Sequence, residues 1–101
     1  YREAIQNISE AEKILEAWAA VDPGNTSAQY QLTTAYRSRG IVHSYNKDRR
    51  KAIADFGRAV SIHRELSSKD PGNKVYLYLR GELLSRIGNL YQELGEEAAA
   101  R

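Results

Sequence analysis

The side chains on which catalysis, metal binding and nucleotide binding depend are few in this chain and show no useful pattern. There is no cysteine, which excludes disulfides and thiolate metal sites. His43 and His63 are the only histidines, and they fall on different predicted helices with no nucleophile spaced to pair with either. The glycines never form a phosphate-binding run after a strand. We therefore predict no catalytic, cofactor-binding or metal-binding residue and no enzyme activity in this chain.

Phosphate binding is a second chemistry to consider, because basic residues crowd one stretch of the chain. They are Arg37, Arg39, His43, Lys47, Arg49, Arg50 and Lys51. The net charge is only +2, and Asp48 interrupts the run. A solvated tip of a helical hairpin explains the cluster equally well, so we do not expect a nucleic-acid partner. No uncharged stretch approaches the ~20 residues that cross a bilayer, so we expect no membrane insertion of this segment.

The elements that would position these side chains are set by a repeated turn. Asp22-Pro23-Gly24-Asn25 recurs as Asp70-Pro71-Gly72-Asn73, 48 residues later. Proline cannot continue a helix, glycine tolerates positive φ, and asparagine is a good helix N-cap. A fixed period of this size is typical of repeat proteins.

Apolar residues between the turns recur every three or four positions, which predicts helices. The expected helices cover about residues 1–21, 26–46, 49–69 and 74–94. We expect Gly95 to end the fourth helix and residues 96–101 to open a fifth. Gly40 and Gly88 lie inside helices, and we interpret them as points where a neighbouring helix comes close. No stretch alternates with period two, so the predicted fold is all-α.

The 48-residue offset extends beyond the turn. Ala4, Ile5, Ala11 and Ile14 are matched by Ala52, Ile53, Ala59 and Ile62, and Tyr30 and Gly40 by Tyr78 and Gly88. We therefore divide the chain, as one repeat-domain fragment, into the second helix of a truncated repeat (1–21), a complete repeat (22–69), and the first helix and start of the second helix of another (70–101). Because the chain begins within a helical pattern and lacks an initiator methionine, we expect it to be part of a longer protein.

These residues resemble the tetratricopeptide repeat, whose unit is a pair of antiparallel helices totalling 34 residues. The matching positions are Leu32, Tyr36, Gly40, Val42, Ala52, Phe56, Ala59 and Pro71. Each helix is seven residues longer than in the family, which accounts for the period of 48. Seven residues are about two helical turns, so the buried face keeps its direction. The resemblance covers the whole chain and implies helical hairpins stacked as an α-solenoid.

In this family the first helix of each pair lines a concave face that binds peptides or partner helices. Carried over to this chain, the resemblance implies a groove formed by Ser27, Tyr30, Thr34, Arg37 and Ser38 from one repeat and Val75, Tyr78, Glu82, Ser85 and Arg86 from the next. Stacked repeats are expected to place Tyr30 and Tyr78 side by side, and tyrosine suits interfaces. The alternative is that both tyrosines are partly buried between helices.

Repeats of this length also resemble the arrays that follow serine/threonine kinase domains in some bacterial proteins. The resemblance implies a non-catalytic protein-interaction module, a regulatory or scaffold part of such a kinase, with a protein or peptide ligand. Because the sequence shows no signal-peptide pattern and no membrane-spanning stretch, we expect a cytoplasmic location. The alternative function is a structural spacer or a self-association element. Exposed apolar faces on the end helices favour self-association through those ends.

Overall fold

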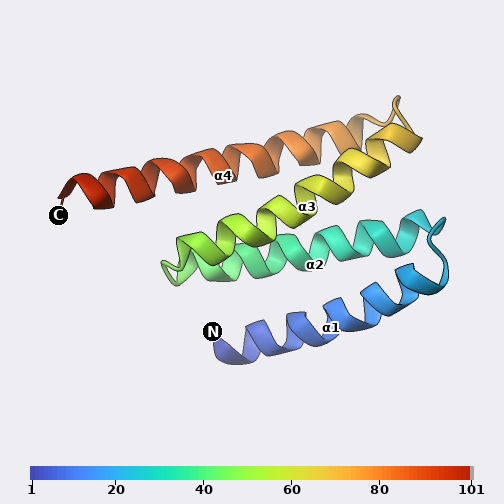
Figure 1. Cartoon of the computed structure of the whole chain (residues 1–101), viewed down its shortest axis with the longest axis horizontal. Helices are drawn as coiled ribbons and strands as arrows, with labels where there is room; N and C mark the ends of the chain where they lie inside the picture. The colour runs from blue at the N-terminus through green and yellow to red at the C-terminus, as the bar shows by residue number, and fades with distance from the viewer. Residues whose placement is uncertain (101) are drawn as a thin grey trace.

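The protein folds into four α-helices joined by short turns (Figure 1). The computed structural model describes residues 1–100, with side chains through residue 99. The helices in that part of the chain are α1 (Arg2–Val21), α2 (Thr26–Tyr45), α3 (Arg49–Lys69) and α4 (Lys74–Ala100). No strand occurs among the described residues. The predicted all-α fold of helical hairpins is therefore confirmed.

The two Asp-Pro-Gly-Asn turns act in the same way. Asp22 and Asp70 leave their helices with nearly equal backbone angles, φ −133° and −139°. The Asn25 side chain then accepts hydrogen bonds from the amides of Ser27 (3.0 Å) and Ala28 (3.2 Å), as an N-cap does. Asn73 caps α4 in the same manner. The repeated sequence thus starts α2 and α4 with the same local geometry.

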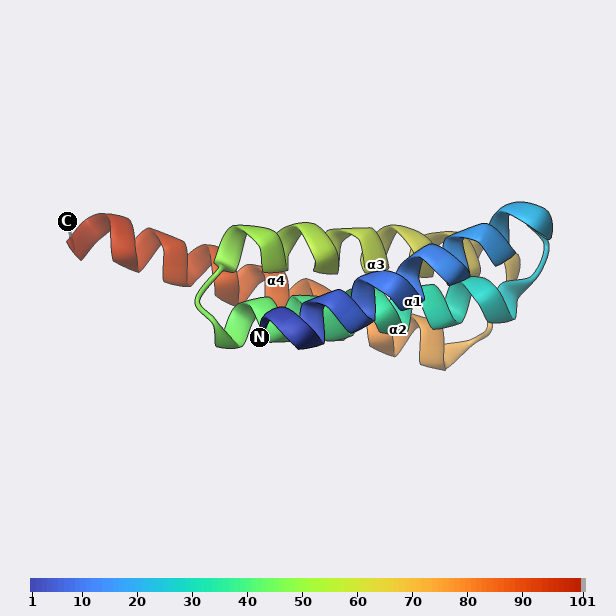
Figure 2. The ribbon, with the colours of Figure 1, turned by 90° about the horizontal axis from the view of Figure 1, so that it is seen from below.

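Each helix packs against the one before it in the chain, so α2 lies between α1 and α3, and α3 between α2 and α4. Successive helices are antiparallel, and α2 and α4 consequently run in the same direction (Figures 1 and 2). Figure 2 shows α3 lying over α2 and α4. This is the arrangement of stacked helical hairpins, and it leaves a face shared by α2 and α4.

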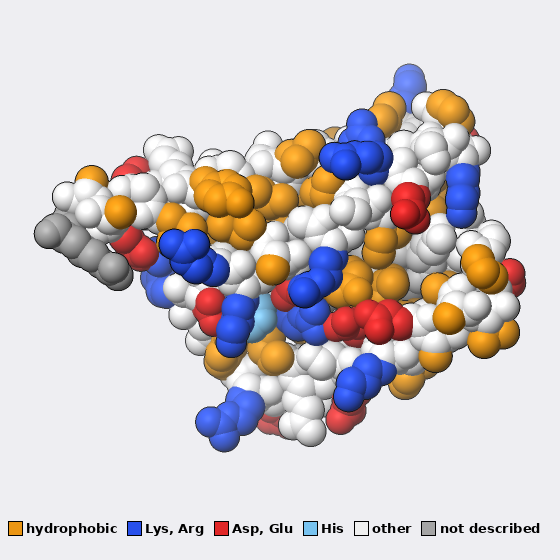
Figure 3. Space-filling model, in the orientation of Figure 1, with side chains coloured by type: hydrophobic (Ala, Val, Ile, Leu, Met, Phe, Trp, Pro, Cys, Tyr) orange, Lys and Arg blue, Asp and Glu red, His pale blue; other side chains and the backbone are white. Residues whose placement is uncertain are grey.

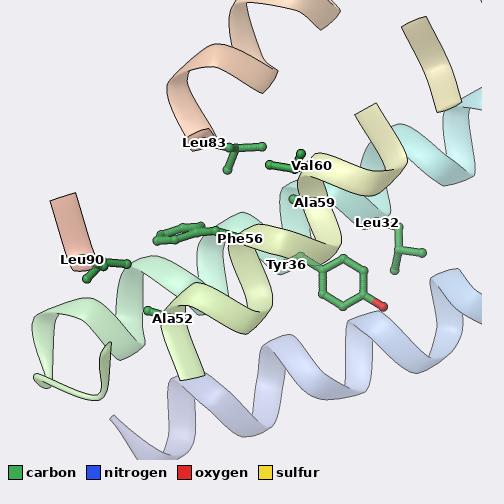
Figure 4. Close-up of a cluster of buried hydrophobic side chains, with 8 residues drawn as sticks. All are labelled: Leu32, Tyr36, Ala52, Phe56, Ala59, Val60, Leu83 and Leu90. Carbon is green, nitrogen blue, oxygen red and sulfur yellow. The ribbon is translucent and has the colours of Figure 1, made fainter. Parts of the chain in front are cut away.

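The core is centred on Phe56 of α3, which is fully buried (Figure 4). Leu83 and Leu90 of α4 reach it from one side, and Tyr36 of α2 belongs to the same cluster. Gly40 of α2 admits the ring, because a Cβ at this position would lie only 2.5 Å from Cε1 of Phe56. The predicted close approach of a helix at Gly40 is confirmed.

Arg39, next to Gly40, joins three helices through buried ion pairs. Its guanidinium donates to both carboxylate oxygens of Asp55 on α3, at 2.9 and 2.8 Å, and to Glu12 and Ser9 on α1. Arg58 also binds Asp55, at 2.8 Å. Asp55 is only 2% exposed, and a buried carboxylate needs such partners. Figure 3 shows positive and negative side chains adjacent in the middle of this face.

Two expectations about glycine are wrong. Gly88 has no atom within 4 Å of where its Cβ would lie, so no helix approaches it within the described residues. Gly95 does not end the fourth helix, because α4 continues to Ala100. Arg49 at the start of α3 binds both Glu93 (2.7 Å) and Glu97, which holds α4 helical on either side of Gly95.

Both histidines are buried and serve packing. His43 is 6% exposed; it shares a 2.7 Å hydrogen bond with the Tyr1 hydroxyl and lies 3.7 Å from Asp55. His63 is 3% exposed, and its Nδ1 has no hydrogen-bond partner. Burial lowers the pKa of His63, and the positive charge of the half-buried Arg80 lowers it further. Burial also lowers the pKa of His43, against the opposing effect of Asp55.

The Gly40 contact predicts opposite effects for the same substitution at two glycines. Gly40→Ala should lower the free energy of unfolding by about 1–3 kcal/mol, because the new methyl overlaps the buried Phe56 ring. Gly57→Ala, where a Cβ meets nothing within 4 Å, should raise it by up to ~1 kcal/mol through helix propensity. Urea denaturation measures both. Equal stabilisation by the two substitutions would contradict the close approach.

The buried His63 predicts a stability that falls in mild acid. The folded protein binds fewer protons than the unfolded chain between the lowered pKa of His63 and its ordinary value of 6.5. The free energy of unfolding should therefore decrease as the pH drops through that window, and the decrease should be smaller in His63→Leu. Urea denaturation at about pH 7 and pH 5 makes the comparison. Parallel pH profiles for the two proteins would show that His63 is not responsible.

Candidate binding groove between α2 and α4

An ion pair joins α2 and α4 along their shared face. Arg37 donates two parallel hydrogen bonds to Glu82, from Nε to Oε1 (2.8 Å) and from Nη2 to Oε2 (3.0 Å). Arg86, one turn further along α4, donates to the same Glu82 carboxylate at 3.3 Å. Three of the predicted groove residues are thus brought together, as a partly exposed polar patch at mid-groove.

This patch is electrostatically fixed. The hydrogen bonds and positive charge of Arg37 lower the pKa of Glu82, with a smaller contribution from Arg86. The same contacts raise the pKa of Arg37. Glu82 therefore stays ionised at neutral pH, and a bidentate pair of this geometry has a defined orientation. One positive charge is left over among these three side chains.

The end of the groove where α2 and α4 begin is aromatic. The ring of Tyr30 packs edge-on against buried His63, with centroids 6.1 Å apart, and lies 6.2 Å from the ring of Tyr76. Tyr30 is 36% exposed, whereas Tyr78 is 72% exposed. The expected pairing of Tyr30 with Tyr78 is replaced by a pairing with Tyr76, which leaves the Tyr78 ring open to solvent beside exposed Val75.

The remaining predicted groove residues are small and polar. Ser27 and Thr34 are exposed on α2, and Ser38 is half-buried. The Thr34 hydroxyl donates to the carbonyl of Tyr30 at 3.4 Å, and Ser85 is exposed on α4. These side chains leave room above the helices, and they can donate and accept hydrogen bonds from a bound segment.

A cavity of about 280 Å³ lies at the other end of the groove. Its walls are α2 and α4, and Phe56 of α3 forms part of its floor. The lining side chains include Ile41, Ser44, Tyr45, Phe56, Asn89 and Leu90. Of its lining, only Arg86 was among the predicted groove residues. No signal in the sequence indicated the others, because Phe56 and Leu90 follow the spacing of core residues and belong to the buried cluster.

A second cavity, about 300 Å³, opens beside the Arg39–Asp55 cluster and is lined by residues of α1, α2 and α3. Its charges are already paired, as are most of the crowded basic residues. Arg37 binds Glu82, Arg39 binds Asp55, and Arg49 binds Glu93. Lys51 lies 3.5 Å from Asp48. The basic cluster is thus largely neutralised by neighbouring carboxylates, and the α2–α4 groove is the better candidate for a ligand.

The arrangement suits non-covalent binding of a polypeptide segment. It offers exposed aromatic and apolar side chains at one end, a charged patch in the middle and a cavity at the other. In the part of the chain that the structure describes, no three His, Asp or Glu side chains are grouped to hold a metal ion. Over the same residues, none of the helices has the length and apolar character needed to cross a membrane.

Comparison with known proteins places this architecture in a family. The family model described as plant-specific mitochondrial import receptor subunit TOM20 matches residues 1–96. No curated protein matches the chain, and no solved structure matches it. The family match covers nearly the whole chain, including all the residues of the groove.

This match corrects four predictions. The resemblance to arrays of bacterial serine/threonine kinases is wrong, and so are the functions inferred with it, a kinase-associated scaffold or a structural spacer. The cytoplasmic location is also wrong, because it rested on the absence of a targeting signal, whereas the family is mitochondrial. The bacterial origin is wrong because the matching family is plant-specific. Receptors of this kind are not enzymes, and their partners are proteins. The chain belongs to the family of the plant-specific mitochondrial import receptor subunit TOM20.

Proposed function

We propose that this chain is the protein-binding part of a mitochondrial import receptor, and that the groove between α2 and α4 holds a segment of the protein being imported. The family supports the receptor role. The observation that supports binding in the groove is the cavity of about 280 Å³, which lies between the two helices predicted to form the concave face. We also propose the division of the chain into repeats, with a complete repeat at residues 22–69.

The size of the cavity indicates what enters it. Pockets for whole small molecules measure roughly 300–1,000 Å³, so this cavity is slightly smaller than that range. It suits one or two apolar side chains projecting from a polypeptide. Phe56 and Leu90 supply apolar surface at the bottom, while Ser44 and Asn89 supply polar groups near the rim. A segment anchored there can extend along α2 and α4.

The composition of the groove fits an amphipathic segment. Mitochondrial targeting segments are amphipathic, rich in arginine and poor in acidic residues. The apolar side of such a segment can contact Tyr78, Val75 and the cavity. Glu93 accepts from Arg49 through Oε2, but its side chain is 49% exposed at the cavity, so the same carboxylate can also meet a basic residue of the segment.

Self-association through the end helices also stays a proposal, separate from the groove. Apolar side chains are exposed on both end helices, such as Ile14 (71%) on α1 and Leu84 (49%) on α4. These faces do not line the groove, so association there leaves the groove open.

The groove proposal predicts which substitutions weaken ligand binding. The probe is a fluorescein-labelled amphipathic peptide of about 20 residues with targeting-segment composition. Asn89→Trp, which fills the cavity rim from an exposed position, should weaken binding at least tenfold. Tyr78→Ala should weaken it by about tenfold through loss of an exposed aromatic contact. Fluorescence anisotropy measures the dissociation constants.

Tyr91→Ala is the matched control, since Tyr91 is another exposed tyrosine of α4 that lies outside the groove. Its dissociation constant should equal that of the unmodified chain. Loss of binding in Tyr91→Ala with retention in Asn89→Trp would move the binding surface to the opposite side of α4. No binding of the peptide to the unmodified chain would reject the receptor role for these residues.

A further inference from the structure

The exposed face of α3 is strongly basic. Nine side chains of this helix are exposed, and five of them are lysine or arginine: Arg50, Lys51, Arg58, Arg64 and Lys69. Along α3, all of which the structure describes, Glu65 is the only exposed acidic residue, because Asp55 is buried. Five basic residues against one acidic residue leave this face with four excess positive charges. Figure 3 shows Lys and Arg side chains at intervals along this side of the molecule.

Ion pairs within the protein leave these basic side chains accessible. Lys51 lies 3.5 Å from Asp48, but its side chain is 69% exposed. Arg58 binds Asp55 at 2.8 Å and is still 55% exposed. Asp55 is already bound by both ends of the Arg39 guanidinium, so it compensates Arg58 only in part. The basic side chains of α3 therefore face solvent and can meet a negative partner.

Small side chains occupy the centre of the same face. Ala54, Ser61 and Ser68 are exposed and follow one another at steps of seven residues, which places them in one row along the helix. Helical spacing puts Lys51 and Arg58 on one side of this row, and Arg64 lies on the other. The long stems of lysine and arginine extend past such short side chains. Positive charges thus form the outermost layer of this face.

We propose that the exposed face of α3 lies against the surface of a membrane that contains anionic lipids, with its lysine and arginine side chains bound to lipid phosphate groups. Clusters of basic residues on one helix face are attracted to such surfaces. The 21 residues of α3 extend over about 31 Å, so the face contacts several lipids at once. The contact is peripheral, because none of the described helices could cross a membrane.

The composition of this face favours a membrane over a protein or a nucleic acid. Protein interfaces are usually centred on large aromatic or aliphatic anchors, and nucleic-acid sites add Asn or Gln amides or stacked aromatic rings to their basic residues. Among the exposed residues of α3, which the structure describes completely, none is of these types. Charge alone is left for recognition, and mobile lipid phosphates satisfy it without a partner of defined shape. The family match to a mitochondrial import receptor is consistent with a membrane as the neighbouring surface.

Contact through α3 leaves the groove open. Phe56 projects from the buried side of α3 and lines the groove cavity. The groove therefore opens on the side of α2 and α4 that lies away from the exposed face of α3 (Figure 2). A chain held on a membrane in this way presents its groove to the aqueous phase. The inference goes beyond the proposed ligand of the groove and does not depend on it.

Co-sedimentation of residues 1–101 with lipid vesicles tests the proposal. Each Lys or Arg near an anionic surface contributes roughly fivefold to binding. The partition coefficient should therefore be about a hundredfold higher on phosphatidylcholine vesicles with about 30% phosphatidylserine than on pure phosphatidylcholine vesicles. It should fall as salt is raised from about 50 to about 250 mM, because salt screens exposed charges. Arg50→Gln combined with Arg64→Gln should lower it about twentyfold. Both side chains are exposed, so this variant should keep its circular dichroism spectrum.

Lys47→Gln combined with Lys74→Gln is the matched control, because it removes the same charge from exposed residues outside α3. Its partition coefficient should fall by less than about threefold. Equal losses in the two double variants would overturn the assignment to α3, and equal binding to the two kinds of vesicle would overturn the role of anionic lipids. Binding to a labelled DNA or RNA duplex without binding to the anionic vesicles would replace the membrane with a nucleic acid.

Single cysteines report the orientation, since the chain has no cysteine of its own. Ser61→Cys lies in the central row of the α3 face, and Ser85→Cys lies on the groove side of α4; both positions are exposed. With a polarity-sensitive fluorophore on each, the emission from residue 61 should shift to the blue on anionic vesicles, and the emission from residue 85 should not change. A shift at residue 85 alone would place the groove on the membrane and contradict the proposal.

Discussion

The close approach of α3 to α2 at Gly40 is the constraint on which the rest of the structure depends. With no side chain at this position, the Phe56 ring lies directly on the α2 backbone. The ring in turn meets Leu83 and Leu90, so the position of α4 follows from the same contact. The cavity at the end of the groove has Phe56 in its lining for this reason. A single absent side chain therefore sets the distances among three helices.

The ion pairs beside this contact fix the register of the helices. Arg39 and Asp55 are the immediate neighbours of Gly40 and Phe56, so the apolar and charged contacts form together. A buried ion pair contributes little net stability compared with apolar packing, but an unpaired Asp55 in this position would be costly. A slip of α3 along α2 would separate Asp55 from Arg39 and would also remove the ring from Gly40. The network consequently excludes alternative registers, and it ties α1 into the same arrangement through Glu12.

The sequence predicts the helices well because the signals that start and stop them are local. Asn25 and Asn73 cap the helices that follow, and the prolines stop the ones that precede. The contacts that each residue makes with distant segments are not predictable in this way. Gly40 and Gly88 have the same type and the same repeat position, yet only Gly40 meets another helix. Nothing near Gly95 reveals that Arg49, more than forty residues earlier, holds α4 helical beyond it. Such facts depend on contacts between distant segments.

The candidate groove illustrates the same limit. The repeat period predicts that Arg37 and Glu82 share one face, but it does not predict that they form a bidentate ion pair. It also does not predict the cavity, because Phe56 has the sequence pattern of a core residue. The attribution to kinase-associated arrays failed because the repeat period reports how helices stack, which unrelated proteins share. The surface side chains carry the function. In this protein the same helix, α4, carries Tyr78 and Glu82 on the candidate groove and leaves Leu84 and Gly88 exposed on another face. A substitution on one of these faces can therefore leave the other face unchanged.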